Sequence, residues 1–222
     1  MDDILLKISI MLVPGVFAIT MHEAAHGYVA WHFGDPTARM LGRLTLNPLK
    51  HLDIIGTLML LLIGIGWAKP VPVVMENLRN PRRDMIWVSA AGPVTNILLA
   101  ILSALALRGL LIAGKGMPQG AQDFFLVPVL LMLFFSVYIN VLLAIFNLIP
   151  IPPLDGGRIL SGILPARLAA ALDSIERFGM IIIILLVFSK VLNPIIFPMH
   201  SYFTKLLVGP GNFGLVLKPL MQ

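Results

Sequence analysis

The stretch that decides the fold is Met21-His22-Glu23-Ala24-Ala25-His26-Gly27, which lies inside an apolar run from Ile8 to Trp31. It reads His-Glu-x-x-His. Two histidines four residues apart lie on the same side of a helix, and a neutral imidazole is a good zinc ligand. The glutamate directly follows the first histidine, so it can reach a water on the metal without being a ligand itself.

The setting of this motif is unusual, because ionisable side chains are costly inside an apolar span. The alternative interpretation is a helix that carries incidental polar residues. That alternative is disfavoured, since a glutamate and two histidines in an apolar helix need partners. We therefore interpret the motif as part of a metal site.

The composition around the motif is that of an integral membrane protein. The 222 residues are 58% hydrophobic and only 12% charged, with a mean hydropathy of +0.94. Soluble domains are about 45–50% apolar and about 25% charged. The absence of cysteine excludes a disulfide framework, a cysteine zinc site and a thiol nucleophile. The net charge of +5 is expected to mark cytoplasmic loops and not nucleic-acid binding.

Hydrophobic segments outward from the motif predict an all-α polytopic membrane protein with four full transmembrane helices. We expect these helices at about 5–33, 85–111, 124–149 and 178–197. No repeat or linker interrupts the chain. We therefore expect one membrane-embedded domain over residues 1–222.

Two further elements are predicted between these spans. The apolar run 54–67 is glycine-rich and shorter than the roughly 20 residues that a full crossing needs. Pro70 and Pro72 then favour extended backbone. We expect a re-entrant or β-hairpin-like element over about 54–74, and one interfacial amphipathic helix over about 158–173.

A catalytic zinc site normally has three protein ligands and a water, so two histidines do not complete it. The candidates for the third ligand are Asp155, His32, Asp35, His51, Asp53 and Glu176. Asp155 follows a proline-rich stretch at the end of an apolar helix and precedes two glycines, which permit unusual backbone angles. A ligand role is favoured over its alternative, an N-cap of a helix that starts near Arg158. For the candidates before residue 54, roles at helix ends and interfaces are favoured.

A shared metal would constrain the topology. The histidines lie in the C-terminal half of the first span and Asp155 lies just past the third, so an odd number of crossings must separate them. Either the run 54–67 does not cross, or Asp155 is not a ligand of the metal. Ten Lys and Arg residues lie in the loops 34–85 and 150–177, against five on the opposite side. This asymmetry predicts an N-terminus outside and a site near the cytoplasmic face.

The motif His22-Glu23-Ala24-Ala25-His26, together with Asn147, Pro150 and Leu154-Asp155-Gly156, resembles the site-2 protease family of intramembrane zinc metalloproteases. The family pattern is H-E-x-x-H followed by N-x-x-P-x-x-x-x-D-G, and both parts match at full spacing. The stretches 91–96 and 66–73 are similar to further family elements. Without a PDZ or CBS domain, or a leading helix before the motif, the chain is similar to the short prokaryotic members.

This resemblance implies an intramembrane zinc endopeptidase of the prokaryotic cell membrane that hydrolyses peptide bonds in or near transmembrane segments. One zinc ion would be held by His22, His26 and Asp155. Glu23 would act as general base and then pass the proton to the leaving amine. Asn147 would hold the substrate backbone or the oxyanion. Asn96 is a further substrate-binding candidate, for which an interhelical hydrogen bond is the favoured alternative.

Substrate binding has a physical requirement of its own. A transmembrane helix hides its peptide bonds in backbone hydrogen bonds, so cleavage needs local unwinding, and the freed strand needs new partners. Addition to an edge strand would supply them. The region 56–74 is the predicted edge, and a transmembrane protein substrate and the lipid bilayer are the predicted partners.

Two other classes of function remain open. A metal-binding membrane protein or transporter without protease activity would be expected to place several ligand sites along a path, often within inverted repeats. A scaffold that only retains the fold would not need Glu23. Neither the substrate nor the oligomeric state is indicated by the sequence.

Overall fold

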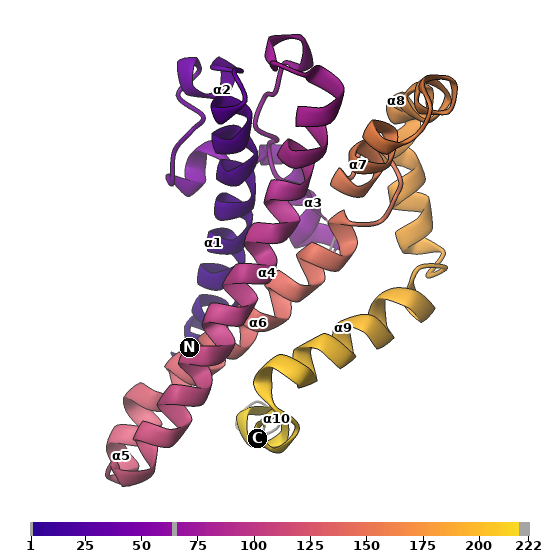
Figure 1. The fold of residues 1–222 in the computed structure, drawn as a ribbon. Coiled ribbons are helices and arrows are strands. Elements are labelled where there is room, and N and C mark those ends of the chain that lie inside the picture. The colour runs from indigo at the N-terminus through magenta and orange to yellow at the C-terminus, as the bar shows by residue number, and fades with distance from the viewer. Residues whose placement is uncertain (1, 64–65, 218–222) are drawn as a thin grey trace. The chain divides into compact units, whose positions relative to one another are not determined.

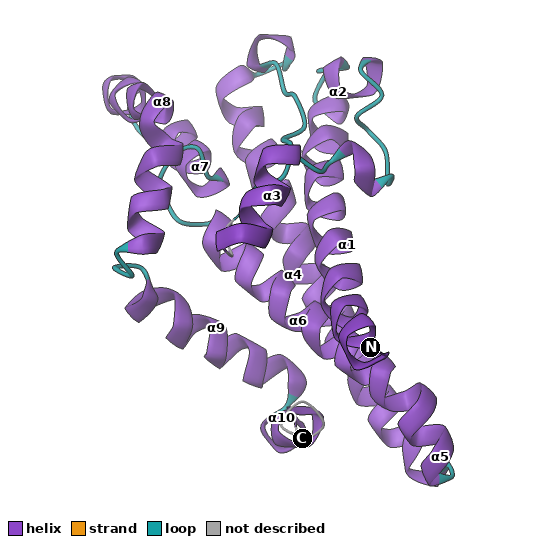
Figure 2. Ribbon diagram, turned by 180° about the vertical axis from the view of Figure 1, so that it is seen from behind, coloured by secondary structure: helices purple, strands orange, loops and turns teal. Residues whose placement is uncertain are grey.

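The computed structural model describes residues 2–63 and 66–217, and within these ranges the chain is helical apart from turns and extended connections. No β-strand is present in these ranges; an isolated antiparallel bridge joins Leu52 and Ala68. The prediction of an all-α protein is confirmed. Figure 1 shows the course of the chain, and Figure 2 shows the connections from behind.

The α-helices are unequal in length. Their bounds are α1 Asp2–His32, α2 Thr37–Met40, α3 Ile54–Ile63, α4 Pro81–Ala113, α5 Gln119–Ala121, α6 Val127–Asn147, α7 Asp155–Ile163, α8 Ala166–Phe188, α9 Asn193–Val208 and α10 Pro210–Leu217. A π-helical turn at Gln122–Leu126 precedes α6.

The chain divides into two compact units. The first unit contains Met1–Ala18, Asn96–Ile145 and Asn193–Gln222, and the second contains Ile19–Thr95 and Phe146–Leu192. The boundary falls inside α1, α4 and α6, so each of these helices contributes to both units. The prediction of one domain stays a prediction.

The first unit has an apolar core between α1, α4, α6 and α9. Small residues of α4, such as Ala100 and Ala104, are buried in it and let neighbouring helices approach closely. Polar groups inside this unit are paired: Asn96 Nδ2 donates to Asn140 Oδ1 at 2.8 Å, and the hydroxyls of Ser103 and Ser136 lie 2.8 Å apart. Each of these contacts joins α4 to α6.

The second unit has a smaller apolar core, in which Ala30 of α1, Val88 of α4 and Leu78, which precedes α4, are buried together. Helices α7 and α8 lie side by side in it, shown in orange in Figure 1. Arg158 of α7 donates to Glu176 of α8 at 2.9 Å. The extended residues 66–74, which lie between α3 and α4, also belong to this unit.

Two helical stretches in the described part of the chain are long and apolar enough to cross a membrane, namely Pro81–Gly116 and Phe124–Asn147. Helices α8 and α9 pass the same test only as a pair, which would make three. Helix α1 is not among them. The chain is an integral membrane protein, and the count of four spans is not confirmed.

Three predicted boundaries need correction. The interfacial helix expected over 158–173 is two helices, because α7 ends at Ile163 and Pro165 precedes a new helix, α8. The span expected over 178–197 is interrupted at residues 189–192, where Lys190 has a positive φ of 58°. Within 54–67, α3 is helical over Ile54–Ile63, so a hairpin is not formed there; residues 64 and 65 lie outside the described ranges.

Candidate metal centre

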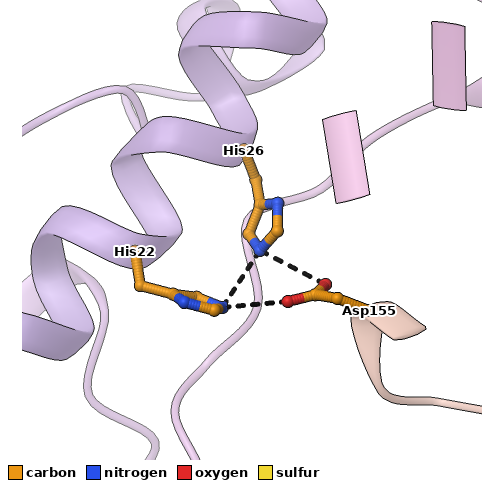
Figure 3. A group of neighbouring side chains, drawn as sticks. All are labelled: His22, His26 and Asp155. Atoms are coloured by element: carbon orange, nitrogen blue, oxygen red, sulfur yellow. Dashed lines mark hydrogen bonds and ion pairs between the residues drawn. The ribbon is translucent and has the colours of Figure 1, made fainter. Parts of the chain in front are cut away.

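Three buried side chains converge in the second unit, and they come from two helices distant in sequence. His22 and His26 project from one face of α1, and Asp155 is the first residue of α7 (Figure 3). His22 Nε2 lies 3.2 Å from Asp155 Oδ2, and His26 Nε2 lies 3.3 Å from Asp155 Oδ1. The two Nε2 atoms are 3.1 Å apart. The arrangement therefore directs one potential ligand atom of each residue to a common point.

The orientation of His26 is set by α4. Its Nδ1 lies 2.7 Å from the carbonyl oxygen of Val88, which can only accept a hydrogen bond. Nδ1 must therefore carry a proton, which leaves Nε2 as the nitrogen of His26 that can bind a metal ion. A backbone carbonyl that orients a histidine in this way is a frequent feature of metal sites.

A glycine allows α4 to approach the imidazoles. A Cβ atom built on Gly92 would lie 2.5 Å from both His22 Cε1 and His26 Nε2. Real Cβ atoms do not approach other atoms so closely, and the rings could not keep their positions. Glycine at residue 92 therefore lets α4 pack on the histidine pair without moving the rings.

Asp155 faces the histidines and does not cap a helix. The N-cap of α7 is Leu154, and no side chain makes a capping hydrogen bond there. Burial by itself raises the pKa of Asp155, but the adjacent imidazoles of His22 and His26 lower it to about 2. The carboxylate is therefore ionised at neutral pH, as a metal ligand must be.

The donor set fits a zinc ion. Tetrahedral zinc has bonds of about 2.0–2.2 Å, so its ligand atoms are about 3.3–3.6 Å apart. The three separations of 3.1, 3.2 and 3.3 Å match this spacing closely enough that small side-chain shifts would suffice. Two imidazoles and one carboxylate leave a fourth position open, which is the pattern of catalytic zinc sites.

Glu23 lies between the two histidines in sequence and is half buried. Its Oε2 accepts a hydrogen bond from the backbone N–H of Val71 at 2.8 Å. The extended stretch after α3 thus reaches the glutamate of the motif. The sequence motif alone does not indicate this contact.

Known proteins are similar to this chain over most of its length. A model of peptidase family M50 matches residues 116–189. A Bacillus subtilis protein named "Putative zinc metalloprotease YwhC" is 40% identical over 191 residues, which are 85% of this chain and 84% of that relative. This chain belongs to peptidase family M50.

More distant relatives agree with this assignment. The protein named "Putative zinc metalloprotease Rip2" from Mycolicibacterium smegmatis is 31% identical over 200 residues, covering 87% of this chain and 73% of the relative. Its counterpart in Mycobacterium tuberculosis strain H37Rv is 27% identical over 191 residues, covering 83% and 69%. No solved structure matches the chain. The predicted family, the class of zinc metalloprotease and the zinc cofactor are confirmed.

The remaining candidate ligands of this M50 peptidase have other partners. His32 is exposed beside Phe33, and the ring of His51 bonds the carbonyl oxygen of Thr45 at 2.8 Å. Asp53 Oδ1 accepts from Gly56 N at 2.7 Å, so its predicted capping role, at the start of α3, is confirmed.

Two acidic candidates are also engaged away from the histidines. Glu176 of α8 pairs with Arg158 of α7. Asp35 is fully buried just beyond the end of α1, and accepts from Thr37 and from the stretch that follows α3. The described contacts thus place neither residue among the converging ligand atoms.

The two asparagines proposed for substrate binding occupy different positions. Asn147 is half buried at the last residue of α6, eight residues before Asp155. Asn96 is fully buried, and donates to Asn140 Oδ1 at 2.8 Å and to the Ala18 carbonyl at 3.4 Å. These contacts are the interhelical bonds expected of the alternative role, and the substrate roles of both residues stay predictions.

Three features of the site were missed by sequence reasoning. They are the Val88 carbonyl on His26, the approach of Gly92 and the Val71 N–H on Glu23. Gly92 lies in the stretch 91–96 that resembles a family element, and Val71 lies in the stretch 66–73 that resembles another. The resemblance therefore indicated the segments of Gly92 and Val71. It did not indicate which backbone groups contact the motif, because nearly every residue type offers the same backbone groups.

Proposed function

We propose that this chain is an intramembrane zinc endopeptidase that hydrolyses peptide bonds in or near transmembrane segments of membrane proteins. The observation that carries the proposal is the convergence of His22, His26 and Asp155. It occurs in a chain of mean hydropathy +0.94 that belongs to a peptidase family. Among the described residues this is the single group of metal-ligating side chains, whereas a transporter would be expected to place several along a path.

The proposed roles follow from the chemistry of each side chain. His22, His26 and Asp155 would hold zinc, which when bound supplies a Lewis acid that polarises the scissile carbonyl and acidifies water. Glu23 accepts the proton of the attacking water and delivers it to the leaving amine. Asn147 donates its side-chain amide to the substrate backbone or the oxyanion.

The proposed topology has four crossings, by α1, α4, α6 and the α8–α9 pair, with α3 re-entrant. The ten residues of α3 are too few for a full crossing, which supports this view. The excess of Lys and Arg in loops 34–85 and 150–177 supports an N-terminus outside and a site near the cytoplasmic face of a prokaryotic plasma membrane.

The proposed edge for the unwound substrate is narrower than the predicted region 56–74. Residues 56–63 are helical and offer no free edge, so residues 66–74 are what remains. Lys69 N donates to the His51 carbonyl at 2.9 Å, which ties one side of this extended stretch to the protein. The proposal is that the substrate strand pairs with backbone groups of this stretch other than the N–H groups of Val71 and Val74, which are bonded to Glu23 and Asp35.

The decisive experiment compares wild-type protein with Glu23→Gln, both purified in detergent, for metal content and for cleavage of a panel of single-span peptides. Wild-type protein should contain one zinc ion and cleave at least one peptide. Glu23→Gln should keep the metal and lose about 10²–10⁴-fold in cleavage rate, the range for loss of a general base. Absence of zinc, or equal cleavage by the two proteins, would overturn the proposal.

A further inference from the structure

The carboxylate of Asp35 lies at the centre of a hydrogen-bond cluster that the proposed mechanism does not use. Asp35 is 0% exposed. Its Oδ1 accepts from the backbone N–H of Thr37 at 3.0 Å, from the Thr37 hydroxyl and from Asn77 Nδ2 at 3.0 Å. Its Oδ2 accepts from the backbone N–H of Val74 at 2.7 Å. Two of these four donors belong to the stretch between α3 and α4.

The same stretch contacts the glutamate of the motif. The backbone N–H of Val71 donates to Glu23 Oε2 at 2.8 Å. Pro70 and Pro72 have no N–H, so Val71 supplies the one backbone donor of residues 70–72. The stretch therefore makes hydrogen bonds to two carboxylates, through Val71 to Glu23 and through Val74 to Asp35.

Packing on α1 supports this attachment. A Cβ atom on Gly27 would lie 3.0 Å from Val71 Cγ1, so the valine side chain packs directly against the helix one turn beyond Glu23. Further along the chain, Arg79 N donates to the Phe33 carbonyl at 3.0 Å. Two contacts, one at Val71 and one at Arg79, thus fix the position of this stretch along α1.

We propose that Asp35 is a positioning residue for Glu23. By holding Val74, it keeps the Val71 N–H on one oxygen of the Glu23 carboxylate, so that the carboxylate is oriented with its other oxygen toward the water that it deprotonates. The inference rests on the proposed function of Glu23. The anchoring of Val71 and Val74 by Asp35 does not rest on it, and is measured separately.

The test variant is Asp35→Asn, because the geometry of the cluster predicts how an amide would be placed. Its oxygen would take the Oδ1 position, which accepts from three donors, and its NH₂ group would face the Val74 N–H. The substitution therefore removes the hydrogen bond to Val74 selectively. Val74→Pro deletes the same hydrogen bond from the donor side, and so serves if Asp35→Asn does not fold.

The matched control is Asp84→Asn. Asp84 is also buried, and its Oδ2 also accepts from a backbone N–H, that of Asn80 at 2.7 Å at the start of α4. The contacts described for Asp84 do not reach residues 71–77. A general cost of replacing a buried carboxylate would therefore affect the control equally.

The first readout is hydrogen–deuterium exchange of the zinc-loaded protein in detergent, followed in peptides that cover residues 71–77. Asp35→Asn and Val74→Pro should accelerate exchange at Val71 about tenfold, the equivalent of one hydrogen bond to a charged group. Asp84→Asn should leave this exchange unchanged. Unchanged exchange at Val71 in both test variants would overturn the anchoring.

The second readout is zinc content and steady-state cleavage of a peptide that the wild type cleaves. Both test variants should keep one zinc ion and lower kcat about tenfold, with KM within about twofold, because the general base is misoriented. Equal losses in Asp84→Asn would assign the effect to stability and overturn the positioning role. If no peptide is cleaved by wild-type protein, the proposed function fails while the exchange result still decides the anchoring.

Discussion

Two buried polar clusters in this protein differ in how their atoms meet. In the first unit, Asn96 and Asn140 pair a donor with an acceptor, and the hydroxyls of Ser103 and Ser136 pair in the same way. In the second unit, two imidazole nitrogens and a carboxylate face one another. The first cluster satisfies itself, whereas the second brings together lone pairs that need a cation or protons between them.

This difference separates a structural polar group from a functional one in an apolar chain. Polarity inside a membrane helix is costly in either case. A neutral pair offsets that cost with a hydrogen bond between two helices, as Asn96 and Asn140 do between α4 and α6. Converging bases need a proton or a cation between their lone pairs, so they indicate a ligand.

Replacement of a converging base should have the largest effect. Asp155→Ala removes one of three ligands and the only negative charge among them, so we expect loss of stoichiometric zinc and a fall in cleavage of more than about 10³-fold. Metal analysis and peptide cleavage measure both. Glu176→Ala, which removes the partner of Arg158, is the control and should retain zinc. Normal zinc content in Asp155→Ala would contradict the assignment of the second cluster as a metal site that includes Asp155.

Asn147 and Asn96 should also differ in whether their replacement affects the reaction or the stability of the fold. Asn147→Ala should lower kcat about 10²-fold at unchanged zinc content, the cost of losing an oxyanion donor. The measurement is steady-state cleavage together with metal analysis. An unchanged kcat would remove Asn147 from the reaction.

Asn96→Ala is the counterpart in the self-satisfied cluster. It removes the donor to the buried Oδ1 of Asn140, so we expect the protein to lose about 1–3 kcal/mol of stability while KM and kcat stay near wild-type values. Thermal unfolding in detergent and cleavage kinetics test this. A raised KM at unchanged stability would instead support the predicted substrate role of Asn96.

The approach of α4 to the imidazoles gives a smaller, graded effect. Gly92→Ala places a methyl group against both histidines and should weaken zinc affinity about 10–100-fold, as changes next to metal ligands do. Gly109→Ala is a matched control in the same helix, because a Cβ there meets nothing within 4 Å. Competition with a chelator measures both affinities, and equal affinities would show that the close contact has no consequence.

The smallest expected effect is on acid stability. Burial by itself raises the pKa of Asp35, but hydrogen bonds from Thr37, Asn77 and Val74 together hold it below the ordinary value of 3.8. A lowered pKa contributes stability that is present above 3.8 and is lost as the pH falls through the folded value. In metal-free protein, the difference in melting temperature between wild type and Asp35→Asn should be constant above about pH 5 and shrink below about pH 4. A difference independent of pH would contradict the assignment.

Much of the site could be predicted because its chemistry resides in side chains. The spacing of His22, Glu23 and His26 indicates one helical face, and the stretch from Asn147 to Asp155 indicates a carboxylate at the end of a helix. Element boundaries were less accurate. The break at Pro165 was missed because amphipathic residues continue on both sides of it, and the interruption near Lys190 was missed because a positive φ at a lysine has no sequence signal.

By itself, the sequence determined the membrane class, the helical architecture, the pair of histidines with their glutamate and the favoured third ligand. These depend on composition and local periodicity, which a chain carries before it folds. Only the tertiary structure decided that Val88 orients His26, that Gly92 makes room for the imidazoles and that Val71 and Val74 lie on Glu23 and Asp35. Backbone donors and acceptors are nearly the same at every residue, and a glycine does not show which neighbour it makes room for. Their use therefore becomes visible only when distant segments are packed together.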